Sequence, residues 1–128
     1  MLFNVPDRET DRSTGHRDPG AQVWITAETL ADGTSLVSVR GEVDLHTAPH
    51  LERVLDDAMR SGERDVHVEL SREIFIDSTG MRVLIQAAER LKAMGRSLRV
   101  ATGNPHTRGV IETMGLAEKI GLGPGANE

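Results

Sequence analysis

The chain has 128 residues, of which 38% are hydrophobic and 27% are charged, and its formal net charge is −5 at pH 7. This length allows a single domain with one core, and the composition is typical of a globular chain. The negative charge and the few aromatic residues, one Trp and two Phe, argue against nucleic-acid binding. The absence of Cys excludes disulfides, a thiolate nucleophile and a Cys-ligated zinc site.

No apolar segment approaches the length of a transmembrane helix, and the N-terminus lacks the apolar stretch of a signal peptide. We therefore expect a cytoplasmic protein with no membrane association. Residues 1–20 show little apolar periodicity and are predicted to be a flexible N-terminal arm. Residues 21–122 are predicted to form the domain, and residues 123–128 a flexible tail.

The first predicted element is a β-hairpin. Residues 23–27 are apolar at alternate positions, which is the pattern of a strand with two different faces. Asp32-Gly33 supplies the chemistry of a tight turn, and a second strand resumes over residues 36–39 and is closed by residues 41–44.

The first helix is predicted to begin with Thr47 as its N-cap and Pro49 in its first turn, and to end at Ser61-Gly62. Its apolar positions recur at intervals of three or four residues. These positions are Leu51, Val54, Leu55, Ala58 and Met59. A strand over residues 66–70 follows.

The stretch from Ile74 to Met81 leads into a second helix, which is predicted to stop near Gly95. Asp77 or Ser78 can cap the free amides of its first turn, and the same amides favour an anion such as phosphate. The hydroxyl is therefore either a cap or a site of modification, and the residues alone leave both open. The apolar positions of this helix are Met81, Leu84, Ala87, Ala88, Leu91 and Met94.

A strand over residues 98–101 precedes a third helix, which is capped by Asn104, packs in part through Met114 and ends at Gly115. Residues 116–122 are predicted as a last strand. The resulting order, β-β-α-β-α-β-α-(β), predicts an α/β fold with a mixed sheet and helices packed against it.

Metal and hydrolase interpretations are weak. His46 and His50 are four residues apart, but no third ligand has a fixed spacing to them, so we favour solvated or capping histidines over a zinc site. A serine hydrolase acting through Ser78 lacks the Gly-x-Ser-x-Gly turn on which such nucleophiles depend.

Two loops carry a resemblance to a known family. The segment Gly41-Glu42-Val43-Asp44 closes a strand, and the segment Asp77-Ser78-Thr79-Gly80 opens a helix, with one helix and one strand between them. The pair Gly115-Leu116 follows the third helix. This pattern resembles the STAS domain, specifically the bacterial anti-anti-sigma factors (anti-sigma factor antagonists), and implies a single STAS-like domain over residues 21–122.

The resemblance implies a switch controlled by phosphorylation, without catalysis of its own. Ser78 matches the phosphate acceptor, and Thr79, which stands where many members have a second Ser, is the second choice. Gly80 matches a glycine that lets a partner approach the helix start closely. The implied partner-binding residues are Glu42, Asp44, His46, Thr47, Asp77, Ser78, Thr79, Gly80 and Met81.

The implied partner is an anti-sigma factor that is also a serine kinase of the histidine-kinase-like ATPase type. This partner would use ATP, whereas no cofactor or metal is implied for the chain itself; a serine phosphatase is a further candidate partner. The unphosphorylated form would bind the anti-sigma factor and free a sigma factor. The alternatives are a STAS subunit of a larger signalling scaffold, a partner of a response regulator phosphatase, and a small serine hydrolase.

Overall fold

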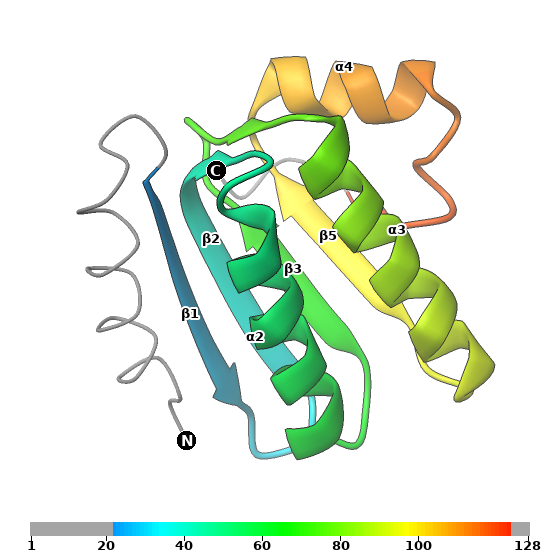
Figure 1. Ribbon diagram of the computed structural model, residues 1–128. Coiled ribbons are helices and arrows are strands. Elements are labelled where there is room, and N and C mark those ends of the chain that lie inside the picture. The colour runs from blue at the N-terminus through cyan, green and yellow to red at the C-terminus, as the bar shows by residue number, and fades with distance from the viewer. Residues whose placement is uncertain (1–21, 124–128) are drawn as a thin grey trace.

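The computed structural model describes residues 22–123, which form a five-stranded mixed sheet with helices α2 and α3 on one face and α4 at one end (Figure 1). The predicted arm and residues 124–128 of the predicted tail lie outside the described residues. The elements are β1 (Val23–Thr29), β2 (Ser35–Val43), α2 (Ala48–Ser61), β3 (Val66–Leu70), β4 (Phe75–Ile76), α3 (Ser78–Ala93), β5 (Leu98–Thr102) and α4 (Pro105–Thr113).

The sheet has the strand order β1-β2-β3-β5, with β1 antiparallel to β2 and the remaining pairs parallel. Strand β4 has only two residues and pairs in parallel with the last two residues of β2. The α/β class, the mixed sheet and the initial hairpin are therefore confirmed, whereas β4 is an element that the sequence pattern did not predict.

The hairpin turn forms as expected from its Asp-Gly pair. Gly33 has a φ of 92°, which a residue with a Cβ rarely adopts. The Asp32 carboxylate accepts a hydrogen bond from the Thr34 amide at 2.9 Å, and this bond lowers the pKa of Asp32. The turn is thus stabilised by local backbone chemistry rather than by burial.

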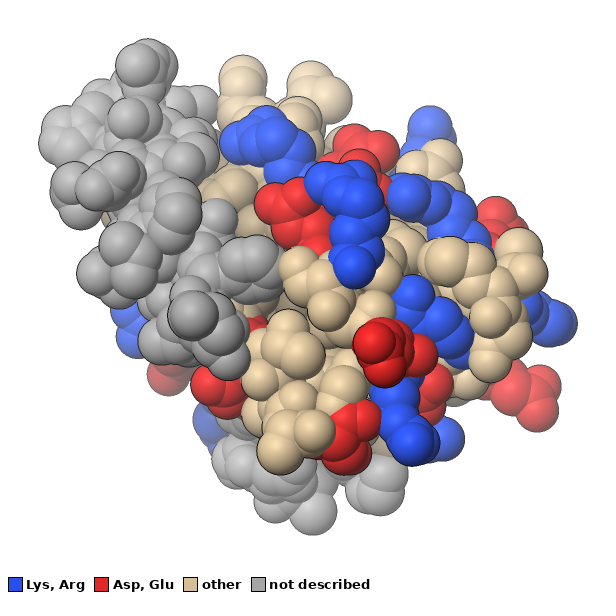
Figure 2. Space-filling view, turned by 90° about the horizontal axis from the view of Figure 1, so that it is seen from below, with Lys and Arg blue, Asp and Glu red and all other residues tan. Residues whose placement is uncertain are grey.

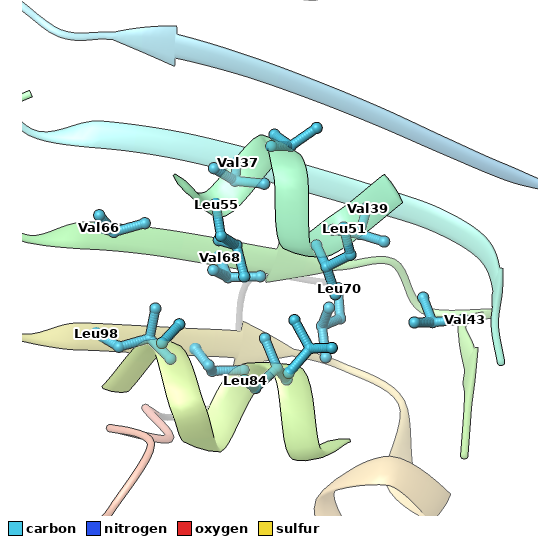
Figure 3. Packing of buried hydrophobic residues seen from close by; sticks show 14 of the residues in the cluster. Val37, Val39, Val43, Leu51, Leu55, Val66, Val68, Leu70, Leu84 and Leu98 are labelled. Carbon is cyan, nitrogen blue, oxygen red and sulfur yellow. The ribbon is translucent and has the colours of Figure 1, made fainter. Parts of the chain in front are cut away.

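The core lies between the sheet and the two long helices (Figure 3). Leu51 and Leu55 of α2 and Leu84 of α3 are directed at the strands, where they meet residues such as Val68 and Leu70. All five apolar positions predicted for the first helix are buried. Burial of apolar area on this one face is the main force that holds the helices on the sheet.

Two predictions about the C-terminal third are wrong. Residues 116–122 form turns rather than a strand, because Ile120 and Leu122 donate backbone hydrogen bonds to Leu116 and Ala117, and only Leu122 bridges to β5. Met94 and Met114, which were expected in the core, are exposed. Each is the C-terminal cap of its helix and so lies beyond the last buried position of that helix, which is Leu91 in α3 and Ile111 in α4.

Charged side chains of both signs are interspersed on the face of the molecule shown in Figure 2. Arg90 pairs with Asp56 across α2 and α3, and Arg99 pairs with Asp65. This face therefore offers no continuous basic surface of the kind that binds nucleic acid. None of the described helices is long and apolar enough to cross a membrane.

Arg96 joins the end of α2 to the connection between α3 and β5. Its guanidinium donates hydrogen bonds to three backbone oxygens, those of Met59 at 2.9 Å, Gly62 at 3.3 Å and Arg64 at 2.8 Å. The carbonyl end of a helix carries partial negative charge, so a cation at this place is favourable. Only the planar, forked guanidinium can reach all three acceptors at once.

We expect Arg96→Ala to lower the free energy of unfolding by about 2 kcal/mol, because hydrogen bonds from a charged donor contribute roughly 1.5 to 3 kcal/mol and this donor is only half-buried. Arg99→Ala is the matched control, since its ion pair is exposed and contributes less than about 1 kcal/mol. Urea unfolding measures both values. Equal losses in the two variants would contradict the role given to Arg96.

Candidate functional site

The two sequence motifs lie side by side at one end of the sheet. Strand β4 pairs Phe75 with Glu42 and Ile76 with Val43, so the turn before α3 is placed against the end of β2. The next residue, Asp77, donates its amide to the Val43 carbonyl at 3.1 Å. The segments that the sequence placed 33 or more residues apart therefore form one surface.

Asp77, and not Ser78, caps helix α3. Its backbone is extended, with φ −98° and ψ −171°, and its carboxylate accepts hydrogen bonds from the amides of Thr79 at 2.9 Å and Gly80 at 3.1 Å. This geometry decides between the two capping candidates. Ser78 becomes the first residue of the helix, and its side chain is exposed.

The Ser78 hydroxyl is available for modification. Within residues 22–123 it forms no hydrogen bond, whereas a nucleophilic serine depends on a hydrogen-bonded base. Thr79, the second candidate acceptor, is half-buried. The difference in exposure favours Ser78 over Thr79 as the residue that an external enzyme can reach.

The loop from β2 to α2 is held by a local network around Asp44 and Thr47. The Thr47 hydroxyl donates to the Glu42 carbonyl at 2.6 Å and accepts from the Asp44 amide at 2.9 Å. The Asp44 carboxylate in turn accepts from the amides of His46 at 2.9 Å and Thr47 at 3.1 Å. Asp44 and Thr47 therefore shape this loop through hydrogen bonds within it.

The prediction that the Thr47 side chain caps α2 is wrong. Thr47 stands at the N-cap position but has helical dihedral angles, φ −101° and ψ −16°, and its side chain makes no hydrogen bond to the helix. Pro49 in the first turn has no N–H to offer. Thr47 is completely buried, and its hydroxyl forms hydrogen bonds within the preceding loop instead.

Gly80 and Met81 face the interior of the domain. A Cβ at Gly80 would lie 2.6 Å from Cγ1 of Val43 and 2.7 Å from Cγ1 of Ile76. The close approach that the glycine allows is thus made by β2 and β4 rather than left open for a partner. Met81 is only 3% exposed, so it packs beneath the surface.

Two exposed apolar side chains at this end were not predicted. Leu45, in the loop after β2, is 69% exposed, and Phe75, in β4, is 54% exposed. Leu45 directly follows Asp44, and Phe75 stands opposite Glu42 in the strand register. The only signal in the sequence was an apolar residue in each loop that fits no helical or strand period.

Asn104 connects this end of the molecule to α4. Its side-chain oxygen accepts from the Thr107 amide at 2.9 Å and so caps α4, as predicted. Its side-chain nitrogen donates to the carbonyl oxygens of Arg72 at 2.7 Å and Ile74 at 3.2 Å. One amide group therefore positions both α4 and the segment that leads to Asp77.

The two histidines near Asp44 differ in their surroundings. His46 is exposed, whereas His50 is buried within the first turn of α2, so of the two expected roles, solvated or capping, burial excludes the solvated one for His50. Among residues 22–123 no group of three His, Asp or Glu side chains converges as metal ligands would. Within the described structure, this end of the sheet therefore combines the exposed Ser78 with the exposed apolar side chains of Leu45 and Phe75.

A comparison with protein families gives the same placement. The family model described as "Mlab, STAS domain" matches residues 26–123. The chain belongs to the STAS domain family. The matched residues include both motifs and all of the elements from β2 to α4.

Curated relatives of this STAS domain are anti-sigma-B factor antagonists. The protein from Staphylococcus aureus (strain NCTC 8325 / PS 47) is 29% identical over 89 residues, which are 70% of this chain and 82% of the relative. The protein from Staphylococcus epidermidis is 32% identical over 85 residues, which are 66% of this chain and 67% of the relative.

Solved structures share the fold. The crystal structure of an anti-sigma factor antagonist from Mycobacterium paratuberculosis has a TM-score of 0.72 and 30% identity, covering 83% of this chain and 89% of that one. The unphosphorylated form of the anti-sigma factor antagonist SpoIIAA has a TM-score of 0.61 and 20% identity, covering 78% of this chain and 88% of that one. The second likeness concerns the fold alone.

We expect Gly80→Ala to lower the free energy of unfolding by about 1 to 3 kcal/mol, because the new methyl group would overpack the contact with Val43 and Ile76. Gly109→Ala in α4 is the matched control, since nothing lies within 4 Å of its Cβ position. That substitution should stabilise the protein by roughly 0.5 to 1 kcal/mol. Thermal unfolding of both variants measures the change in stability. If both substitutions stabilised the protein, or both destabilised it, the packing argument would be refuted.

We expect Asn104→Asp to keep the cap of α4 and to lose both donated hydrogen bonds, because a carboxylate accepts but does not donate. The amides of Ile74 and Asp77 should then exchange about fivefold faster, corresponding to about 1 kcal/mol. Hydrogen exchange followed by NMR measures this change. Unchanged protection at these two amides would show that Asn104 does not position the segment.

Proposed function

We propose that this STAS domain is an anti-sigma factor antagonist that is switched by phosphorylation of Ser78. The unphosphorylated form binds an anti-sigma factor that is also a serine kinase, and this binding frees a sigma factor. The observation that carries the proposal is the exposed Ser78 at the start of α3, with its hydroxyl released from capping by Asp77. Family membership and the names of the curated relatives support it.

The binding surface consists of the loop after β2 and the start of α3. Leu45, in the loop after β2, and Phe75, in β4, provide exposed apolar area at this end of the sheet, and Ser78 provides a neutral hydroxyl. An interface core of this kind is depleted in charge. Glu42 and Asp44 form its polar edge, and Gly80 and Met81 support it from below.

Phosphorylation of Ser78 makes binding of this surface to the partner kinase unfavourable. The Ser78 oxygen forms a bond to the γ-phosphorus of ATP held by the partner kinase, the bond from that phosphorus to the β,γ-bridging oxygen breaks and ADP leaves, and the serine proton passes to a base of the kinase. The product carries about −1.5 to −2 charges at neutral pH. Its burial next to the Asp77 carboxylate and the apolar side chains would be unfavourable, so the complex dissociates.

The switch acts on binding and leaves the fold intact. Ser78 contributes no cap and no buried contact, so its modification removes none of the interactions that hold α3. The chain needs no cofactor or metal in this scheme and performs no catalysis. The proposal places the protein in the cytoplasm with its kinase, and a serine phosphatase would restore the binding form.

We expect Ser78→Ala to bind the partner kinase constitutively and to accept no phosphate, and Ser78→Asp to bind roughly tenfold more weakly or worse, because the new carboxylate would be buried in the interface beside that of Asp77. Thr79→Val is the control for the choice of acceptor. Calorimetric titration with the kinase measures binding, and mass spectrometry after incubation with ATP locates the phosphate.

Phosphate on Thr79 in the Ser78→Ala protein would overturn the choice of Ser78. Equal affinity of wild type and Ser78→Asp would overturn the charge mechanism. A pull-down from the native cell, with and without ATP, identifies the partner. Recovery of a multi-subunit signalling scaffold without any anti-sigma factor would replace the proposal by that alternative.

A further inference from the structure

Arg82 lies one helical turn after Ser78 on α3. The two side chains are at positions i and i+4, which are neighbours on a helix surface, and both are exposed. The residues between and after them, Met81, Val83 and Leu84, are buried, so Arg82 is the outward side chain of its turn.

No carboxylate of the described range 22–123 pairs with Arg82, whereas Arg90, two turns later, pairs with Asp56 of α2. Arg82 is also the only Lys or Arg between residues 78 and 89. A cation that has no carboxylate partner within residues 22–123 therefore stands on the same face of the helix as the exposed hydroxyl.

The start of α3 offers a phosphoryl group fewer free amides than a helix start usually does. A helix start holds phosphate through its free amides. Here the Asp77 carboxylate already accepts from the amides of Thr79 and Gly80. A phosphoryl group on Ser78 would have to displace this cap to reach them, and the carboxylate would repel it.

We infer that Arg82 is the counter-charge that holds the phosphoryl group of phosphorylated Ser78. This inference rests on the proposed function, because it assumes that Ser78 is the acceptor. The order of the pair, anion four residues before cation, is the favourable one on a helix, and a guanidinium binds phosphate oxygens in pairs. The phosphoryl group then lies along the outer face of α3, and the Asp77 cap stays in place.

The pairing explains how the domain accepts a dianion beside Asp77. Arg82, one turn after Ser78, attracts the phosphoryl group and so offsets its repulsion by the Asp77 carboxylate. The phosphorylated form therefore retains the first turn of α3. Arg82 is a positioning residue for the switch, and its removal should affect the phosphorylated form selectively.

The test uses the full chain with phosphoserine incorporated at position 78 during translation, so that no kinase is needed. Phosphorus NMR titration gives the second dissociation constant of the phosphoryl group. In Arg82→Gln the acid dissociation constant for the step from monoanion to dianion should fall roughly two- to fivefold, which means that the pKa of this step rises, because the cation that favours the dianion is lost. Arg82→Lys should retain part of the effect, and added salt should diminish it in the parent protein.

Lys92→Gln is the matched control. It makes the same change of charge on the same helix, about 15 Å further along the axis at a rise of about 1.5 Å per residue, which is beyond the Debye length of about 10 Å at 0.1 M salt. Phosphorylation should also lower the Tm of Arg82→Gln more than that of Lys92→Gln. Equal dissociation constants and equal Tm changes in the two variants would overturn the inference.

Binding of the same proteins to the partner kinase separates this inference from the proposed function. If phosphoserine at position 78 weakens binding but Arg82→Gln titrates like Lys92→Gln, the pairing fails and the switch stands. If the titration depends on Arg82 but phosphoserine leaves binding unchanged, the pairing stands and the proposed switch fails.

Discussion

The contact of the Asp77 carboxylate with two amides of α3 determines what Ser78 can do. Because the Asp77 carboxylate accepts hydrogen bonds from the first amides of α3, the Ser78 side chain is not needed as a cap and is exposed at the surface. The position of Asp77 depends in turn on its amide bond to Val43 and on the short pairing of β4 with β2. In the proposed function, the switch would therefore depend on this fixed backbone as much as on the serine itself.

This backbone is held from three directions. Gly80 allows α3 to lie directly on Val43 and Ile76, Thr47 fastens the neighbouring loop, and Asn104 ties the preceding segment to α4. The proposed binding surface would then be largely formed before a partner arrives, which reduces the ordering cost of association.

Elements can be predicted from the sequence where the apolar pattern extends over several turns or along a whole strand. Two helical faces and the Asp-Gly hairpin were predicted, because their patterns extend over many residues. Strand β4 was missed since two residues show no period, and Asp77 and Ser78 could not be separated since both residue types cap helices and only the backbone angles decide between them. The packing of Gly80 and the exposure of Leu45 depend on neighbours distant in the sequence, which no local pattern reveals.

The exposure of Leu45 has a consequence for how such domains diverge. A side chain that is 69% exposed buries little area in the fold, so its replacement should have little effect on stability, and in the proposed function it would alter the choice of partner. Duplicated copies of the domain in one cell could therefore become insulated from one another's partners through changes at this position. The serine, its cap and the core beneath would be inherited unchanged.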